Sequence, residues 1–180
     1  MPDMEQAPNT VQVATSGKTA FVRVTGCGSF RESPSLKQFG VSLMDEGFNN
    51  MSIDLSPCIG MDSTFMGVLV GLSMRLSRQY GRRLILTGVR PEVAARLKEL
   101  GVDRVMDLEG GLARVEEKRE GEPPPGLRHL EPLATANARR LNLEVSLAAH
   151  EDLCCLRPEN RPKFEDVLAF LREGLKRVAR

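Results

Sequence analysis

The chain has 180 residues, a mass of 19.9 kDa and a formal net charge of +1. Since domains run to roughly 100–200 residues, this length predicts one domain with an appendage. The 25 basic and 24 acidic residues are balanced, and aromatic residues make up only 4%. Duplex binding would require a basic surface and single-strand binding would require stacking platforms. We therefore expect no nucleic-acid partner.

The sequence also predicts a cytoplasmic protein without a membrane span. The longest apolar run, residues 65–72, is far shorter than the ~20 residues that a spanning helix needs. The N-terminal residues MPDMEQAPNT lack the basic and apolar regions of a secretory signal. The four cysteines (Cys27, Cys58, Cys154 and Cys155) have irregular spacing, which is typical of reduced thiols.

A proline-rich segment, GEPPPG at residues 121–126, divides the chain. Its three consecutive prolines forbid a helix and favour an extended connector. We therefore predict four parts: an N-terminal segment (1–18), a folded domain (19–120), the linker (121–126) and a C-terminal helical extension (127–180).

Strand and helix patterns alternate through the predicted domain. Apolar periodicity predicts strands at 21–24, 51–55, 84–86 and 105–106, and helices at 35–48, 64–80 and 91–100. Such alternation predicts the α/β class, in which helices cover a sheet.

The polar residues Asp62, Ser63 and Thr64 open an apolar helix. All three residue types accept hydrogen bonds from the free N–H groups of a helix start. A hydroxyl there also lies at the positive end of the helix dipole, at a turn that a partner can reach. Two interpretations remain open: the residues only cap the helix, or Ser63 is a phosphorylation switch on a docking surface.

The order of the motifs resembles the STAS domain family. A strand ending in DLS is followed by MDSTxxG, an apolar helix, GRRLILTGV and PEVxxRLKELGV, over residues 19–111. Within the family, the pattern is most similar to bacterial anti-sigma-factor antagonists. The resemblance implies a STAS-type mixed β-sheet covered by helices, to which this chain adds a C-terminal two-helix extension.

The resemblance also implies the site residues. It places the phosphorylated serine of the family on Ser63, with Thr64 as the second choice. The implied partner-binding residues are Asp62, Ser63, Thr64, Phe65 and Met66. Phe65 stands where the family usually has glycine. Its ring would either contribute to the docking surface or be buried structure.

The implied function is binding rather than catalysis. An unphosphorylated antagonist of this type captures an anti-sigma factor with serine kinase activity, and phosphorylation by that kinase ends the capture. A rival interpretation is a non-phosphorylated STAS adaptor subunit of a transport or signalling assembly. A homodimer is a further expected partner. An enzyme is the weakest interpretation, because no GxSxG, P-loop or HExxH spacing occurs. No cofactor is expected.

Two features of the extension need separate interpretation. His150 and Cys154 share a helical face, but two ligands do not close a zinc site, so we expect no metal. The predicted helices at 133–156 and 162–178 each carry an apolar stripe that a two-helix hairpin cannot bury alone. The extension must therefore pack on the domain, on a second copy or on a partner.

Overall fold

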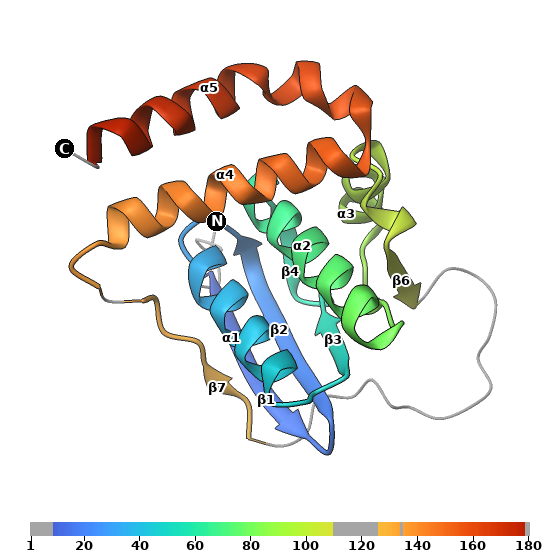
Figure 1. The fold of residues 1–180 in the computed structure, drawn as a ribbon. Helices are drawn as coiled ribbons and strands as arrows, with labels where there is room; N and C mark the ends of the chain where they lie inside the picture. The colour runs from blue at the N-terminus through green and yellow to red at the C-terminus, as the bar shows by residue number, and fades with distance from the viewer. Residues whose placement is uncertain (1–8, 110–125, 134, 179–180) are drawn as a thin grey trace, which may run out of the picture.

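The computed structural model describes residues 9–109, 126–133 and 135–178. In these residues a mixed sheet has seven strands in the order β6-β5-β3-β2-β1-β7, and β4 pairs with the end of β2 (Figure 1). The strands are β1 (Thr10–Ser16), β2 (Thr19–Gly28), β3 (Asn50–Asp54), β4 (Cys58–Met61), β5 (Leu84–Thr87), β6 (Met106–Glu109) and β7 (Arg128–His129). Strands β2, β3, β5 and β6 run parallel, whereas β1 is antiparallel to both of its neighbours.

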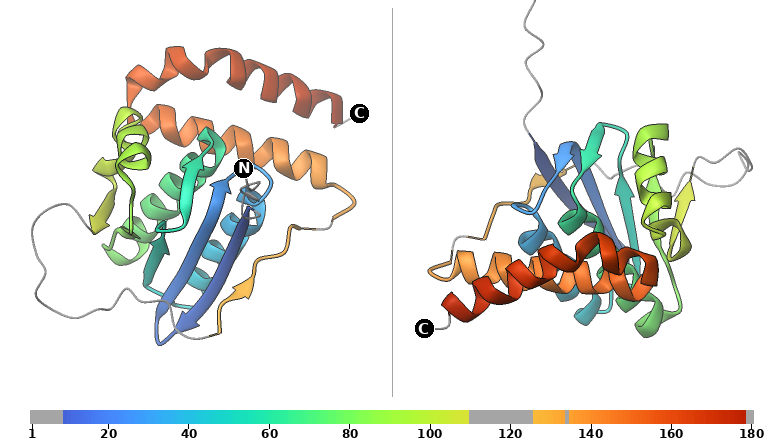
Figure 2. Two further views of the ribbon diagram at one scale, coloured as in Figure 1. Left: turned by 180° about the vertical axis from the view of Figure 1, so that it is seen from behind. Right: turned by 90° about the horizontal axis from the view of Figure 1, so that it is seen from above.

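The helices form layers over this sheet. They are α1 (Ser33–Asp45), α2 (Ser63–Tyr80), α3 (Pro91–Glu99), α4 (Ala138–Leu156) and α5 (Arg161–Val178), with short 3-10 turns η1 (Val102–Arg104) and η2 (Pro158–Asn160). Helices α1 and α2 lie against one face of the sheet. Helix α4 crosses the outer side of α2, and α5 is outermost (Figures 1 and 2).

Local signals explain the bounds of α2, the central helix. Asp62 has extended backbone geometry, and its side chain accepts a hydrogen bond from the N–H of Phe65, as an N-cap does. At the other end Gly81 adopts the left-handed conformation (φ 68°), which glycine reaches without steric cost. Between these caps the first ten residues of the helix are almost all buried. The helix therefore belongs to the core.

The predicted STAS-type α/β fold is confirmed, but three strands were missed: β1, β4 and β7. Strand β1 lies in the segment that we assigned to residues 1–18, and it pairs with β2 along its whole length. The sheet thus begins before Thr19, because Val11 and Val13 alternate into the core. Strand β4 lies before Ser63, where no strand was predicted. Its few residues pair only with the end of β2, and so short an edge strand gives little periodicity.

The extension also differs in detail from the prediction. Strand β7 adds to the outer edge of the sheet by pairing with β1. Helix α4 begins at Ala138 rather than at residue 133, whereas α5 matches its expected bounds within one residue. Most of the proline-rich linker, residues 121–125, lies outside the described residues.

Helix α4 packs unusually close to α2. A Cβ atom added at Gly67 would lie 2.7 Å from the Ala149 Cβ and would also clash with the Ala149 carbonyl oxygen. A Cβ added at Gly71 would lie 2.6 Å from the Asp152 Oδ2. At Gly67 the obstacle is the Ala149 backbone, so only glycine allows this separation, whereas at Gly71 the Asp152 carboxylate could move aside.

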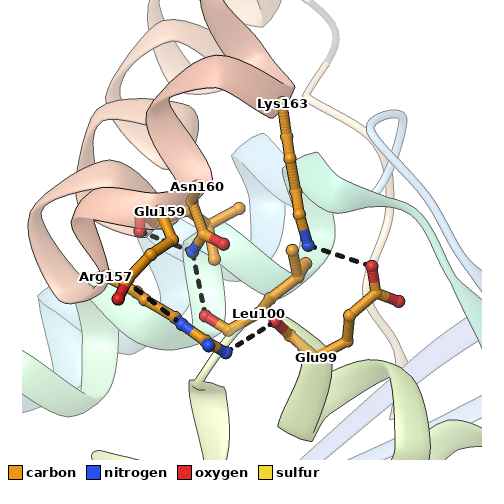
Figure 3. Close-up of polar contacts among 7 residues, drawn as sticks. Glu99, Leu100, Arg157, Glu159, Asn160 and Lys163 are labelled. Atoms are coloured by element: carbon orange, nitrogen blue, oxygen red, sulfur yellow. Dashed lines mark hydrogen bonds and ion pairs between the residues drawn. The ribbon is translucent and has the colours of Figure 1, made fainter.

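Polar contacts tie the turn between α4 and α5 to the end of α3 (Figure 3). The buried Asn160 donates through Nδ2 to the carbonyl oxygens of Leu100 and Leu153, each at 2.9 Å. Arg157 donates to the Glu99 carbonyl oxygen at 3.1 Å, and Lys163 pairs with the Glu99 carboxylate at 3.0 Å. The exposed ion pair adds little, whereas the buried amide fixes the position of the turn.

A first prediction tests this anchor. Asn160→Ala should lower the free energy of unfolding by about 1–3 kcal/mol, since it leaves two buried carbonyl groups without donors. Urea unfolding monitored by circular dichroism measures the change. Glu159→Ala is the matched control, because Glu159 is exposed in the same turn and should have little effect. Equal stabilities for the two variants would contradict the anchoring role.

A second prediction concerns Asp152, which faces α2. Burial raises the pKa of its carboxyl group, although the charges of Lys37 and Arg78 oppose the shift. The native state therefore keeps this proton to a higher pH than the unfolded chain does. As pH rises and the carboxyl group ionises, its contribution lowers the free energy of unfolding. Asp152→Asn should stabilise the protein at neutral pH. Its advantage over the wild type should grow as pH rises above about 4, then level off.

Urea unfolding at several pH values measures that difference. Glu165→Gln is the control, because Glu165 is exposed on α5 and is not one of the charges that shift the Asp152 pKa. A difference between Asp152→Asn and the wild type that does not change with pH would show that the carboxyl group is not destabilised by its surroundings.

Candidate functional site

The start of α2 is clamped to a neighbouring loop by Asp62. One carboxylate oxygen accepts from the Phe65 N–H at 2.8 Å, and the other accepts from the Phe30 N–H at 2.7 Å. Phe30 lies in the loop that follows β2, so a single side chain orders two chain segments that are 32 residues apart in sequence. Asp62 is the N-cap, and the next residue, Ser63, is left free to use its hydroxyl elsewhere.

The hydroxyl of Ser63 points to the C-terminal extension. Its Oγ lies 2.9 Å from Nε2 of His150 on α4. His150 is only 3% exposed, and its Nδ1 lies 2.7 Å from the Ser146 carbonyl oxygen. Because a carbonyl oxygen only accepts, Nδ1 must carry the ring proton. In the neutral ring Nε2 then accepts, so the Ser63 hydroxyl donates to it.

The structure separates the five predicted site residues into two groups. Asp62 and Ser63 are partly exposed, whereas Thr64, Phe65 and Met66 are buried. Phe65 is 0% exposed, and a Cβ added at Gly28 would lie 2.8 Å from its ring. The ring therefore fills the space that Gly28 leaves free. The expectation that Phe65 contributes to a docking surface is corrected: its side chain is part of the core.

An apolar groove beside Ser63 was not predicted from the sequence. A cavity of about 480 Å³ lies between the start of α2 and helix α3, next to the end of β2. We call it the α2–α3 groove. Its lining residues are Cys27, Gly28, Ser29, Ile59, Gly60, Met61, Asp62, Met66, Glu92, Val93 and Arg96.

Two large apolar side chains are exposed around this groove. Ile59, in the groove wall, is 55% exposed, and Phe30, in the loop clamped by Asp62, is 48% exposed. Exposed apolar side chains beside a concave surface are typical of an interaction site. The signal in the sequence was Ile59 itself, a large apolar residue in a short segment for which no element was predicted.

The described residues offer no metal site. Within 9–109, 126–133 and 135–178, no three histidine, cysteine or acidic side chains lie close enough together to hold an ion. His150 uses both ring nitrogens in hydrogen bonds to Ser63 and Ser146. In the same ranges, no helix combines the length and the apolar composition that a bilayer span requires.

Comparison with known families agrees with this architecture. The family model described as "Mlab, STAS domain" matches residues 11–110, which is more than half of the chain. The chain therefore belongs to the STAS domain family, as its motifs indicated. No curated protein matches it.

Solved structures similar to this chain include anti-sigma-factor antagonists. One from Mycobacterium paratuberculosis is 19% identical (TM-score 0.49) over 58% of this chain and 88% of that chain. Unphosphorylated SpoIIAA is 15% identical (TM-score 0.46), covering 57% and 89%. A variant of RsbS from Moorella thermoacetica is 27% identical (TM-score 0.43), covering 57% and 87%.

A third prediction tests the assignment of Phe65 to the core. Phe65→Ala should lower the free energy of unfolding by about 3–5 kcal/mol, since it empties a fully buried site. Ile59→Ala is the matched control, an exposed apolar residue near the same groove, and should change stability by less than about 0.5 kcal/mol. Thermal and urea unfolding measure both. A small change in stability for Phe65→Ala would contradict its burial and support a role for its ring in docking.

Proposed function

We propose that this protein is an anti-sigma-factor antagonist. It binds an anti-sigma factor with serine kinase activity through the α2–α3 groove and the start of α2, and phosphorylation of Ser63 ends the binding. The observation that carries this proposal is a partly exposed serine hydroxyl at the N-terminus of α2, beside a groove in whose wall Ile59 is exposed.

Elementary electrostatics supports such a switch. A phosphoserine carries about −1.5 to −2 charge at neutral pH. The free N–H groups and the dipole at a helix N-terminus favour that charge within the protein itself. A partner that packs apolar surface onto Ile59 would have to desolvate the phosphate or repel it. Affinity would therefore fall without refolding of the domain.

A second candidate is a non-phosphorylated STAS adaptor subunit of a transport or signalling assembly. The contact between Ser63 and His150 favours it, because the hydroxyl is already engaged within the chain. In that case Ile59 and Phe30 would make a constitutive contact with the larger assembly. Thr64, the second choice for phosphorylation, is buried, so a kinase would reach it less readily than Ser63. A homodimer stays a prediction.

A fourth prediction separates the two candidates. Ser63→Asp should bind the anti-sigma factor markedly more weakly than the wild type, because a carboxylate places charge at the interface. Ser63→Ala should bind constitutively, even in the presence of kinase and ATP. It should lower stability by about 1–3 kcal/mol, because Nε2 of the buried His150 loses its donor.

The measurement is partner affinity by calorimetry, with mass spectrometry of the protein after incubation with kinase and ATP. Ser77→Asp is the control, since Ser77 is exposed at the far end of the same helix and should not affect binding. If no phosphate is found on Ser63 and both Ser63 variants bind like the wild type, the adaptor function replaces the switch.

A further inference from the structure

We propose that the α4–α5 hairpin is a built-in cover for Ser63, and that docking of the hairpin and a negative charge on Ser63 oppose one another. The cover itself rests on the contacts between α2 and α4. Its role in regulation rests on the proposed function, because the charge would be supplied by phosphorylation.

The first step is the position of the hairpin. Ser63, Gly67 and Gly71 are spaced four residues apart, so they form one line along α2. Helix α4 meets this line at each of the three residues, through His150, Ala149 and Asp152 respectively. The outward side of α2 that begins at Ser63 is therefore occupied by the chain itself. The α2–α3 groove lies beside this line, and the residues that line it include none from the hairpin.

The second step is the rigidity of the contact with Ser63. The His150 ring is buried, and its Nδ1 bonds to the Ser146 carbonyl oxygen one turn earlier on α4. Its face meets the ring of Phe164 on α5 edge-on, with ring centroids 4.9 Å apart at 73°. Both helices of the hairpin thus hold the imidazole in place, and it cannot turn aside without disturbing them.

The third step is the direction of the hydrogen bond. In the neutral ring Nε2 offers a lone pair, and the Ser63 hydroxyl supplies the proton. A phosphoserine or an aspartate at this position supplies oxygen lone pairs in place of that proton. Lone pairs then face the lone pair of the neutral ring, so the attractive contact becomes repulsive. Docking of the hairpin with this ring in its neutral form and a charge at residue 63 therefore oppose one another.

Thermodynamic linkage makes this opposition reciprocal. The factor by which charge at residue 63 weakens docking of α4 is the same factor by which docking of α4 disfavours that charge. The pairing of β7 with β1 and the hydrogen bonds of Ser35 with Glu131 and Leu133 tie the start of the extension to the domain. These contacts lie outside α4 and α5, so a released hairpin stays attached beside its site.

Hydrogen exchange followed by mass spectrometry tests the cover in the full chain without any partner. In Ser63→Asp, amides of 138–156 and 161–178 should exchange about tenfold faster or more, the factor expected when one buried polar contact is lost. Amides of β2, β3 and β5 should keep their protection, which shows that the domain stays folded. Ser77→Asp is the matched control and should leave the hairpin as protected as in the wild type.

A second variant weakens the contact between α2 and α4 without adding charge. Gly67→Ala favours the helix by propensity but drives a Cβ into Ala149, so it should also speed exchange of the hairpin. Its control is Gly60→Ala, where the added Cβ has only an ordinary contact with Cys27 at 3.8 Å.

The proposal is overturned if Ser63→Asp leaves exchange of the hairpin unchanged while Gly67→Ala speeds it. It is equally overturned if Ser63→Asp slows exchange, since a protonated His150 would then be binding the carboxylate. No kinase or anti-sigma factor takes part in these measurements. A protein that never acquires phosphate on Ser63 can still show the cover, and a confirmed switch can coexist with an unresponsive hairpin. The two failures are therefore distinguishable.

Discussion

The two carboxylate oxygens of Asp62 organise the region on which the proposed activity depends. One oxygen caps α2 through the Phe65 N–H, and the other holds the loop after β2 through the Phe30 N–H. The cap sets the start of α2, from which the Phe65 ring enters the core beside Gly28, and the other contact holds the loop that carries the exposed Phe30. The adjacent Ser63 is thus presented between a fixed helix start and a fixed loop. Through these two backbone contacts Asp62 positions its neighbours.

Because Gly67 has no side chain, helix α4 can pack directly on the outer face of α2. At Gly67 the backbones of α2 and α4 approach closely enough that even a methyl group would clash. Close packing of this kind brings His150 within hydrogen-bond distance of Ser63, although the two residues are 87 positions apart in sequence. The apolar character of the first turns of α2 follows from the same arrangement, because one side faces the sheet and the other faces α4. Helix α2 is therefore packed on both sides, against the sheet and against α4.

The elements that the sequence predicted well are those with a strong local signal. Helix α3 has a proline at its start and glycine after its end, and α2 has Asp62 before an apolar run, so both were located within about one residue. The features that were missed depend on contacts between distant segments. Burial of Phe65 requires Gly28, and the engagement of Ser63 requires His150, and neither partner is near in sequence. Strand β4 is too short to show periodicity, so Ile59 was not recognised as an exposed apolar residue.

Both proposed functions place a partner on the α2–α3 groove, and they differ in whether the Ser63 hydroxyl must also be reached. A partner that binds the α2–α3 groove meets Ile59 and Arg96 while α4 remains in place, so its affinity owes nothing to release of the hairpin. A partner that binds the outer face of α2 must first displace α4, and its apparent affinity falls by the fraction of molecules in which the hairpin is released. Each 1.4 kcal/mol of docking free energy would then weaken that partner about tenfold. A constitutive adaptor needs only the groove. A kinase must reach the hydroxyl itself, which donates to His150 in the closed form. On the proposed function, the free energy that holds α4 against α2 would therefore set how readily Ser63 is modified, while binding at the groove would proceed independently of it.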